Sequence, residues 1–96
     1  MNYPVICKTT HRYTYNKKTK KERFIYILVL RYSEILQRYQ TILIESNGKT
    51  YGRHYDRKLN ITETDIQNTM VAERDIPKAV LNTVNECIKI DKMFNR

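Results

Sequence analysis

Residues 24–30, with the sequence FIYILVL, are the feature that most constrains the fold of this chain. All seven are apolar or aromatic, and Arg23 and Arg31 close the run on either side. Because the run is short and is apolar at both odd and even positions, it predicts a β-strand that is buried on both faces. Such a strand needs neighbours along its edges and a covering layer on each face, which the rest of the chain must supply.

The residues before this run predict its first neighbour. Over residues 3–15, apolar or aromatic side chains alternate with polar ones, which is typical of a half-buried strand. If Tyr15 pairs with Glu22, Cys7 lies opposite Leu30, and one face of the hairpin carries a continuous apolar and aromatic ladder. In this register the other face carries the basic side chains Lys8, Arg12, Arg23 and Arg31.

A second hairpin is predicted from the dipeptide Asn47-Gly48, since both residues tolerate the positive φ values of a type I′ turn. Folding residues 36–46 onto residues 49–57 about this turn places Ile44 opposite Tyr51.

One alternative affects both hairpins. Apolar side chains between Leu28 and Leu43 also recur at helical spacing, so that residues 28–44 can be read as one helix. The β-branched content and the Asn-Gly turn favour strands, with a bend at Ser33 and Glu34 between the two hairpins.

The last third of the chain predicts helix. Thr62 or Thr64 can cap a short helix that carries Ile66 and Met70 on one face, although a fifth strand or an ordered loop fits these residues nearly as well. A longer helix follows, with Asp75 as its N-cap and Pro77 in its first turn. Its apolar stripe consists of Ile76, Val80, Leu81, Val84, Cys87, Ile88 and Phe94. We expect this helix to lie across the aromatic face of the sheet.

These elements predict one domain, residues 1–96, of the α+β class. It would contain an antiparallel sheet of four strands, or five, made from two hairpins, with a C-terminal amphipathic helix packed on one face. Residues 1–58 form the basic hairpin half, residues 59–74 are irregular or a short helix, and residues 75–94 are the C-terminal helix. This order of elements is similar to that of a family of transcription coactivators that bind single strands.

The charge of the chain is unevenly distributed. The 96 residues include 18 Lys and Arg against 10 Asp and Glu, for a net charge of +8. Residues 1–58 hold thirteen of the basic side chains and four of the acidic ones, whereas residues 59–96 hold five and six. An excess confined to one segment predicts a positive surface that faces an anionic partner.

The leading functional hypothesis is therefore non-enzymatic binding of DNA or RNA. Lysines and arginines would contact phosphates, and exposed tyrosines would stack on unpaired bases. Tyr13, Tyr26 and Tyr32 are assigned to the core. The predicted contact residues are Lys8, Arg12, Lys17, Lys18, Lys20, Lys21, Arg23, Arg31, Arg38, Tyr39, Tyr51, Arg53, Tyr55, Arg57 and Lys58.

Two other classes of function stay open. The chain can be a viral or plasmid accessory protein that binds a host protein, since its richness in Ile, Lys, Asn and Tyr is typical of an A/T-rich viral genome. A nuclease that uses His11 or His54 has less support, because no metal-binding carboxylate cluster stands beside either residue. A homodimer through an uncovered part of the last helix would double the basic surface.

The sequence predicts no catalytic residue, no metal site and no cofactor. Two cysteines eighty residues apart, Cys7 and Cys87, do not make a zinc site, and they read as two thiols unless a bridge ties the first strand to the last helix. The longest apolar run is far below the roughly 20 residues that span a bilayer. Without a signal peptide at the N-terminus, we expect an intracellular, cytoplasmic protein and no membrane partner.

Overall fold

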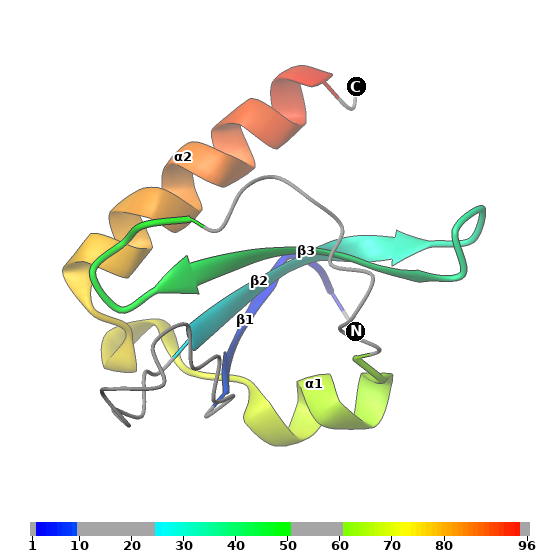
Figure 1. Cartoon of the computed structure of the whole chain (residues 1–96), viewed down its shortest axis with the longest axis horizontal. Coiled ribbons are helices and arrows are strands. Elements are labelled where there is room, and N and C mark those ends of the chain that lie inside the picture. The colour runs from blue at the N-terminus through cyan, green and yellow to red at the C-terminus, as the bar shows by residue number, and fades with distance from the viewer. Residues whose placement is uncertain (1, 10–24, 51–60, 95–96) are drawn as a thin grey trace, which may run out of the picture.

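The computed structural model describes residues 2–9, 25–50 and 61–94 of the chain (Figure 1). Within these ranges the chain forms an antiparallel sheet and helices, which confirms the α+β class and the C-terminal helix. The elements, in chain order, are β1 (Val5–Thr9), β2 (Ile25–Ser33), β3 (Arg38–Glu45), α1 (Glu63–Thr69), a short 3₁₀ helix η1 (Glu73–Asp75) and α2 (Lys78–Phe94). Residues 28–44 are therefore two strands, and the helical alternative is wrong.

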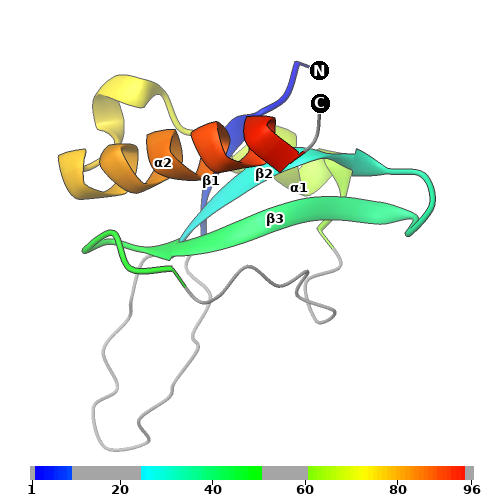
Figure 2. The same ribbon diagram turned by 90° about the horizontal axis from the view of Figure 1, so that it is seen from above.

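Residues 25–30 of the apolar run lie in β2, the middle one of the three described strands. The described strands lie in the order β1-β2-β3 (Figure 2), with α2 across one face and α1 against the other (Figure 1). Leu28 packs under α2 with Val80 and Val84, while Val29 packs on the opposite face with Ile66 of α1. Both strand residues are fully buried, so the prediction of a strand buried on two faces is confirmed.

The predicted register of the first hairpin is wrong by three residues. Cys7 lies opposite Ile27, and not opposite Leu30, while Lys8 lies opposite Tyr26. Because side chains alternate along a strand, this odd shift turns each side chain of β1 to the other face. The sequence does not decide between the two registers, since β2 presents apolar side chains to both faces and either face can accept Cys7.

A β-bulge interrupts the pairing of β2 with β3. Val29 pairs with Thr41, but the next pair is Arg31 with Gln40, which leaves Leu30 as the extra residue. The extra residue reverses the alternation of β2 beyond this point. Arg31 consequently points to the side of α2, and Tyr32, which we assigned to the core, is 47% exposed. The predicted bend is confirmed as a turn at residues 34–37.

The first helix begins where the capping residues predict. The backbone N–H of Asp65 donates to the Thr62 hydroxyl over 3.1 Å, and the Asp65 carboxylate accepts from the backbone N–H of Thr62 over 3.0 Å. This reciprocal pair is a capping box, and it selects helix over the strand and loop alternatives. Ile66 is buried, but Met70 lies beyond the helix end and is 48% exposed, so the prediction that they share a helix face is wrong for Met70.

The second helix begins three residues later than predicted. Asp75 closes η1 and is not the N-cap of α2, because the backbone N–H groups of Asp75 and Ile76 are bonded within the 3₁₀ turn. The predicted apolar stripe is buried or partly buried up to Ile88, whereas Phe94 is 77% exposed. Of the four tyrosines in the described ranges, Tyr26 packs under α2, whereas Tyr3, Tyr32 and Tyr39 lie toward the face covered by α1. The expectation that α2 covers the predicted aromatic face holds for Tyr26, Leu28 and Leu30 of β2. It is wrong for Cys7 and for Tyr32, which lie on the other face.

The two cysteines lie on opposite faces of the sheet. Cys7 is buried beside α1, where its thiol donates to the carbonyl oxygen of Ile66 over 3.7 Å, and Cys87 lies on α2. Both are thiols, and no bridge ties β1 to α2. Burial raises the pKa of the Cys7 thiol above its usual value.

In the described ranges, no helix has both the length and the apolar character needed to cross a membrane.

Candidate functional site

Three of the four described residues that border segments 10–24 and 51–60 meet at one end of the sheet, whereas Ile61, which follows the second segment, packs on the face covered by α1. Both segments lie outside the described residues. Thr9 and Ile25 flank the first segment, and they pair with each other at the last position of β1 and the first of β2. Thr50 precedes the second segment and forms a bridge with Ile44 of β3. Ile44 is next to Glu45, which pairs with Ile25. Three chain positions that border these segments are therefore neighbours at a single sheet end.

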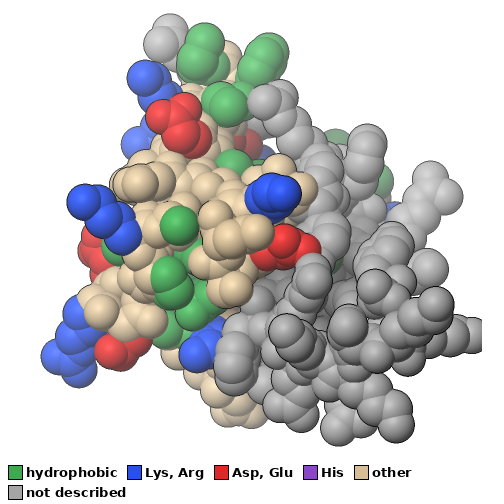
Figure 3. Space-filling model, turned by 60° about the vertical axis from the view of Figure 1, so that its left-hand side comes forward, with side chains coloured by type: hydrophobic (Ala, Val, Ile, Leu, Met, Phe, Trp, Pro, Cys, Tyr) green, Lys and Arg blue, Asp and Glu red, His purple; other side chains and the backbone are tan. Residues whose placement is uncertain are grey.

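Nearly all of the net charge belongs to these two segments. The described residues hold eight Lys or Arg and eight Asp or Glu, and side chains of both signs are interspersed on the surface that Figure 3 shows. Segment 10–24 holds six basic side chains and one acidic one, and segment 51–60 holds three and one. Only Arg96 adds further charge. The described residues, here called the body, are electrically balanced, and nearly all of the excess of +8 lies in segments 10–24 and 51–60.

A tight turn fixes Thr50 at this end. The backbone N–H of Gly48 donates to the carbonyl oxygen of Glu45 over 2.8 Å, and the Thr83 hydroxyl of α2 donates to the carbonyl oxygen of Gly48 over 2.7 Å. Gly48 has φ of +91° but Asn47 does not have a positive φ, so the predicted type I′ turn is wrong. Ile44 pairs with Thr50, one residue before the predicted partner Tyr51.

Three predicted basic contact residues can be placed in the structure. Lys8 lies one position from the end of the sheet where Thr9 and Ile25 pair, with its Nζ atom 5.9 Å from the centre of the Tyr26 ring. Arg31 and Arg38 lie toward the other end, about 23 Å away for Arg38 at the rise of an extended strand. Arg31 donates to Gln40 on β3 and forms an ion pair with Asp91 on α2, so its guanidinium is engaged on two sides.

The predicted surface aromatic Tyr39 is part of a tyrosine cluster. Its ring lies 5.0 Å from that of Tyr32, in an edge-to-face arrangement, and 5.8 Å from that of Tyr3. Burial, together with a hydrogen bond to Tyr39, raises the pKa of Tyr3 to about 12. The Tyr39 ring therefore packs against two other tyrosine rings of this chain, and these contacts stabilise the face under α1.

The remaining predicted contact residues lie outside the described residues. They are Arg12, Lys17, Lys18, Lys20, Lys21, Arg23, Tyr51, Arg53, Tyr55, Arg57 and Lys58, and the two histidines His11 and His54 belong to the same segments.

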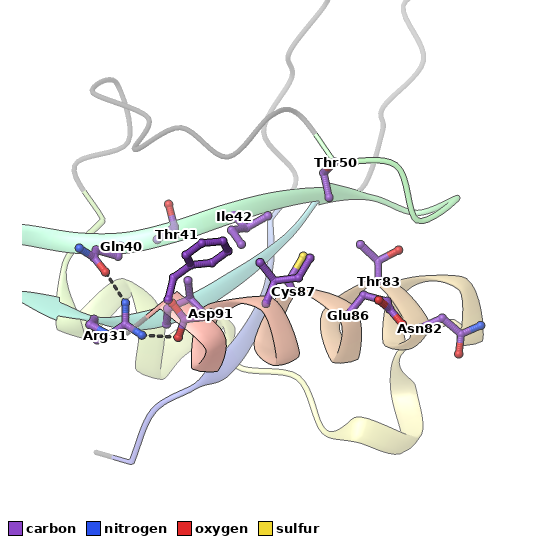
Figure 4. A pocket seen from close by; sticks show the side chains of 13 residues that line it. Arg31, Gln40, Thr41, Ile42, Thr50, Asn82, Thr83, Glu86, Cys87 and Asp91 are labelled. Carbon is purple, nitrogen blue, oxygen red and sulfur yellow. Dashed lines mark hydrogen bonds and ion pairs between the residues drawn. The ribbon is translucent and has the colours of Figure 1, made fainter. Parts of the chain in front are cut away.

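A cavity that the sequence does not indicate lies between α2 and the sheet. Its volume is about 490 Å³. Figure 4 shows Arg31, Gln40 and Asp91 at one end, Thr50, Asn82 and Thr83 at the other, and Ile42 facing Cys87 between them. The apolar side chains of Leu30, Ile90 and Phe94 complete the lining, together with Thr41 and Glu86.

The cavity exists because α2 is held to the sheet at two separated places. Near its N-terminal half, the Thr83 hydroxyl is bonded to the turn at Gly48. In its last turn, Asp91 pairs with Arg31, which the bulge has turned to this side. The helix packs on β2 through Val80 and Val84, and between the two ties it leaves space toward β3. Arg31 and Asp91 are 60 residues apart, so only the fold brings them together.

Neither a search for metal-binding side chains nor comparison with known proteins identifies a function for this chain. Among the described residues, no group of three or more His, Cys, Asp and Glu side chains is placed to hold a metal ion. No protein-family model, curated protein or solved structure matches the chain.

Proposed function

We propose that this protein binds DNA or RNA without catalysing a reaction, through the basic segments 10–24 and 51–60. The observation that carries this proposal is the uneven distribution of charge between the body and these two segments. The balanced charge of the body neither attracts nor repels a phosphate backbone overall, whereas segments 10–24 and 51–60 carry nine basic side chains against two acidic ones.

The chemistry of binding follows from the residue types in these segments. Lys17, Lys18, Lys20 and Lys21 would neutralise phosphates and release counterions, which supplies affinity without sequence preference. Tyr51 and Tyr55 lie in the second segment, between Thr50 and Lys58, and their rings would stack on unpaired bases. Lys8 borders the same sheet end and would extend the contact onto β1.

The proposal includes a larger sheet than the described strands. The bridge between Ile44 and Thr50 supports a fourth strand in residues 51–57 along the outer edge of β3, which would complete the second hairpin. A strand there would present Tyr51 and Tyr55 on one face, since alternate residues of a strand point to the same side. A cytoplasmic location and a homodimer are further parts of the proposal without their own structural support.

Fluorescence anisotropy with labelled single-stranded and double-stranded oligonucleotides tests this function. The variant in which Lys17, Lys18, Lys20 and Lys21 are all changed to Gln should bind at least about tenfold more weakly than the natural chain. The matched control changes Arg74, Lys78, Lys89 and Lys92 to Gln, which removes the same charge from exposed positions on and before α2. This control should bind nearly as well as the natural chain.

Two results would overturn the proposal. Equal loss in both quadruple variants would mean that net charge alone drives binding, and no binding by the natural chain at low salt would mean that nucleic acid is not the partner. In the second case the basic segments would have to dock on a protein, which is the alternative of an accessory factor that acts on a host protein.

A further inference from the structure

The cavity between α2 and the sheet has the chemistry of a small-molecule site. Its lining includes apolar side chains from three elements, among them Leu30 of β2, Ile42 of β3 and Ile90 of α2. Its volume of about 490 Å³ falls in the range of about 300–1,000 Å³ that is usual for ligand pockets. The polar side chains gather at its two ends, so an elongated molecule with an apolar body would match the lining (Figure 4).

The charge of the lining is opposite to that of the chain. Among the described residues, the charged side chains that line the cavity are two carboxylates, Glu86 and Asp91, and one guanidinium, Arg31. Arg31 already interacts with both Gln40 and Asp91. Glu86 is exposed on α2, at the edge of the cavity, where its carboxylate can meet a bound ligand. In a chain of net charge +8, the described lining of this site has a net charge of −1, which disfavours anions.

We propose that this cavity binds a small organic amine, a molecule whose apolar body lies against Leu30, Ile42, Cys87 and Ile90 and whose cationic nitrogen approaches Glu86. Burial of the body removes apolar surface from water, and the carboxylate selects the cation. The ligand is thus distinct from a phosphate, and the proposal does not depend on nucleic-acid binding by the two basic segments.

A matched series of compounds tests the charge preference. Phenylbutylamine, phenylbutanol and phenylbutyrate share one apolar body and differ in the head group, which is cationic, neutral or anionic at neutral pH. Isothermal titration calorimetry or nuclear magnetic resonance titration of the full chain would give their dissociation constants. We expect the amine to bind at least about tenfold more tightly than the carboxylate, a difference of about 1.4 kcal/mol, with the alcohol between them.

The role of Glu86 is tested by Glu86→Gln, with Glu73→Gln as the matched control. Glu86 is an exposed helix residue and glutamine is a good helix former, so the variant should fold. It should lose most of the advantage of the amine and keep the affinity for the alcohol. Glu73 is exposed in η1, outside the lining of this cavity, and its substitution should change none of the three affinities.

The thiol of Cys87 reports where the compound binds. Cys87 lines the cavity and is partly buried, whereas Cys7 is fully buried on the other face and should react more slowly with a thiol reagent. Saturating phenylbutylamine should slow the reaction of Cys87 with the thiol reagent several-fold. Cys87→Ser should abolish this faster of the two reaction phases.

Three outcomes would overturn the proposal. They are the absence of binding by any of the three compounds, binding of the carboxylate as tightly as the amine, and binding of the amine without protection of Cys87. The second outcome would leave a pocket without selection for cations, and the third would place the amine elsewhere on the chain.

Discussion

The body and the two basic segments differ in charge and in the described core. The body holds equal numbers of acidic and basic side chains and contains the described core, whereas segments 10–24 and 51–60 hold nine basic side chains and two acidic ones. Charge that is spread evenly along a chain mainly supports solubility, but an excess collected in two segments suggests an anionic partner. We therefore expect substitutions in the body to change stability and substitutions in the segments to change binding.

The largest effect on stability should come from the central strand. Leu28 is fully buried under α2, so Leu28→Ala should lower the free energy of unfolding by about 2–5 kcal/mol, through lost burial and the cavity left behind. Urea unfolding followed by circular dichroism measures this loss. Anisotropy of the fraction that stays folded should give the oligonucleotide affinity of the natural chain. A parallel loss of oligonucleotide affinity would show that binding depends on the body as well as on the two segments.

The turn before segment 51–60 should be the next most sensitive place. Gly48→Ala introduces a side chain at φ of +91°, and the new Cβ atom would lie 2.8 Å from the carbonyl oxygen of Ala79. Strain of this kind costs about 1–3 kcal/mol, which thermal or urea unfolding can measure. Ser46→Ala changes an exposed residue of the same turn and should leave stability nearly unchanged. Equal stability of the two variants would contradict the docking of this turn on α2.

A smaller loss is expected at the start of α1. Thr62→Ala removes the N-cap hydroxyl and should cost about 0.5–2 kcal/mol, whereas Thr64→Ala, at an exposed position inside the helix, should cost little or nothing. Urea unfolding of the two variants side by side measures the difference. If Thr64→Ala is the more damaging change, the helix does not begin at Thr62.

The smallest effect concerns the tyrosine cluster at alkaline pH. The pKa of Tyr3 is raised to about 12 in the folded chain, from a value near 10 in an unfolded one. Folding therefore favours the neutral phenol. This contribution is fully present below pH 10 and is lost as the pH rises toward 12. Tyr3→Phe should flatten the stability profile in that window, as measured by urea unfolding at stepped pH, and an unchanged profile would exclude Tyr3 as the cause.

Local chemistry made part of this fold predictable from sequence. The capping residues Thr62 and Asp65 lie three positions apart, and their reciprocal hydrogen bonds need nothing from the rest of the chain. The seven-residue apolar run likewise specifies a buried strand, because only a site between two layers accepts apolar side chains on both faces. The dipeptide Asn47-Gly48 likewise predicts a turn from local sequence alone, although it does not predict the type of turn.

Long-range packing made the rest unpredictable. Both faces of β2 are apolar, so the alternation in β1 does not choose a register, and Cys7 fits under α1 as well as it would fit under α2. The bulge at Leu30 leaves no signal in the sequence, yet it turns Arg31 toward α2 and so decides that this residue pairs with Asp91. The cavity depends on that ion pair and on the contact of Thr83 with Gly48, which join residues far apart in the chain.

The most direct test of the division between body and segments is the dependence of oligonucleotide affinity on salt. Each neutralised phosphate contributes about 0.7 to the slope of log K against log salt for a single strand. The account predicts that changing Lys17, Lys18, Lys20 and Lys21 to Gln lowers the magnitude of this slope by up to about 3, and that changing Arg74, Lys78, Lys89 and Lys92 to Gln leaves it unchanged. An equal decrease in both variants, or none in the first, would contradict the assignment of phosphate contacts to the basic segments.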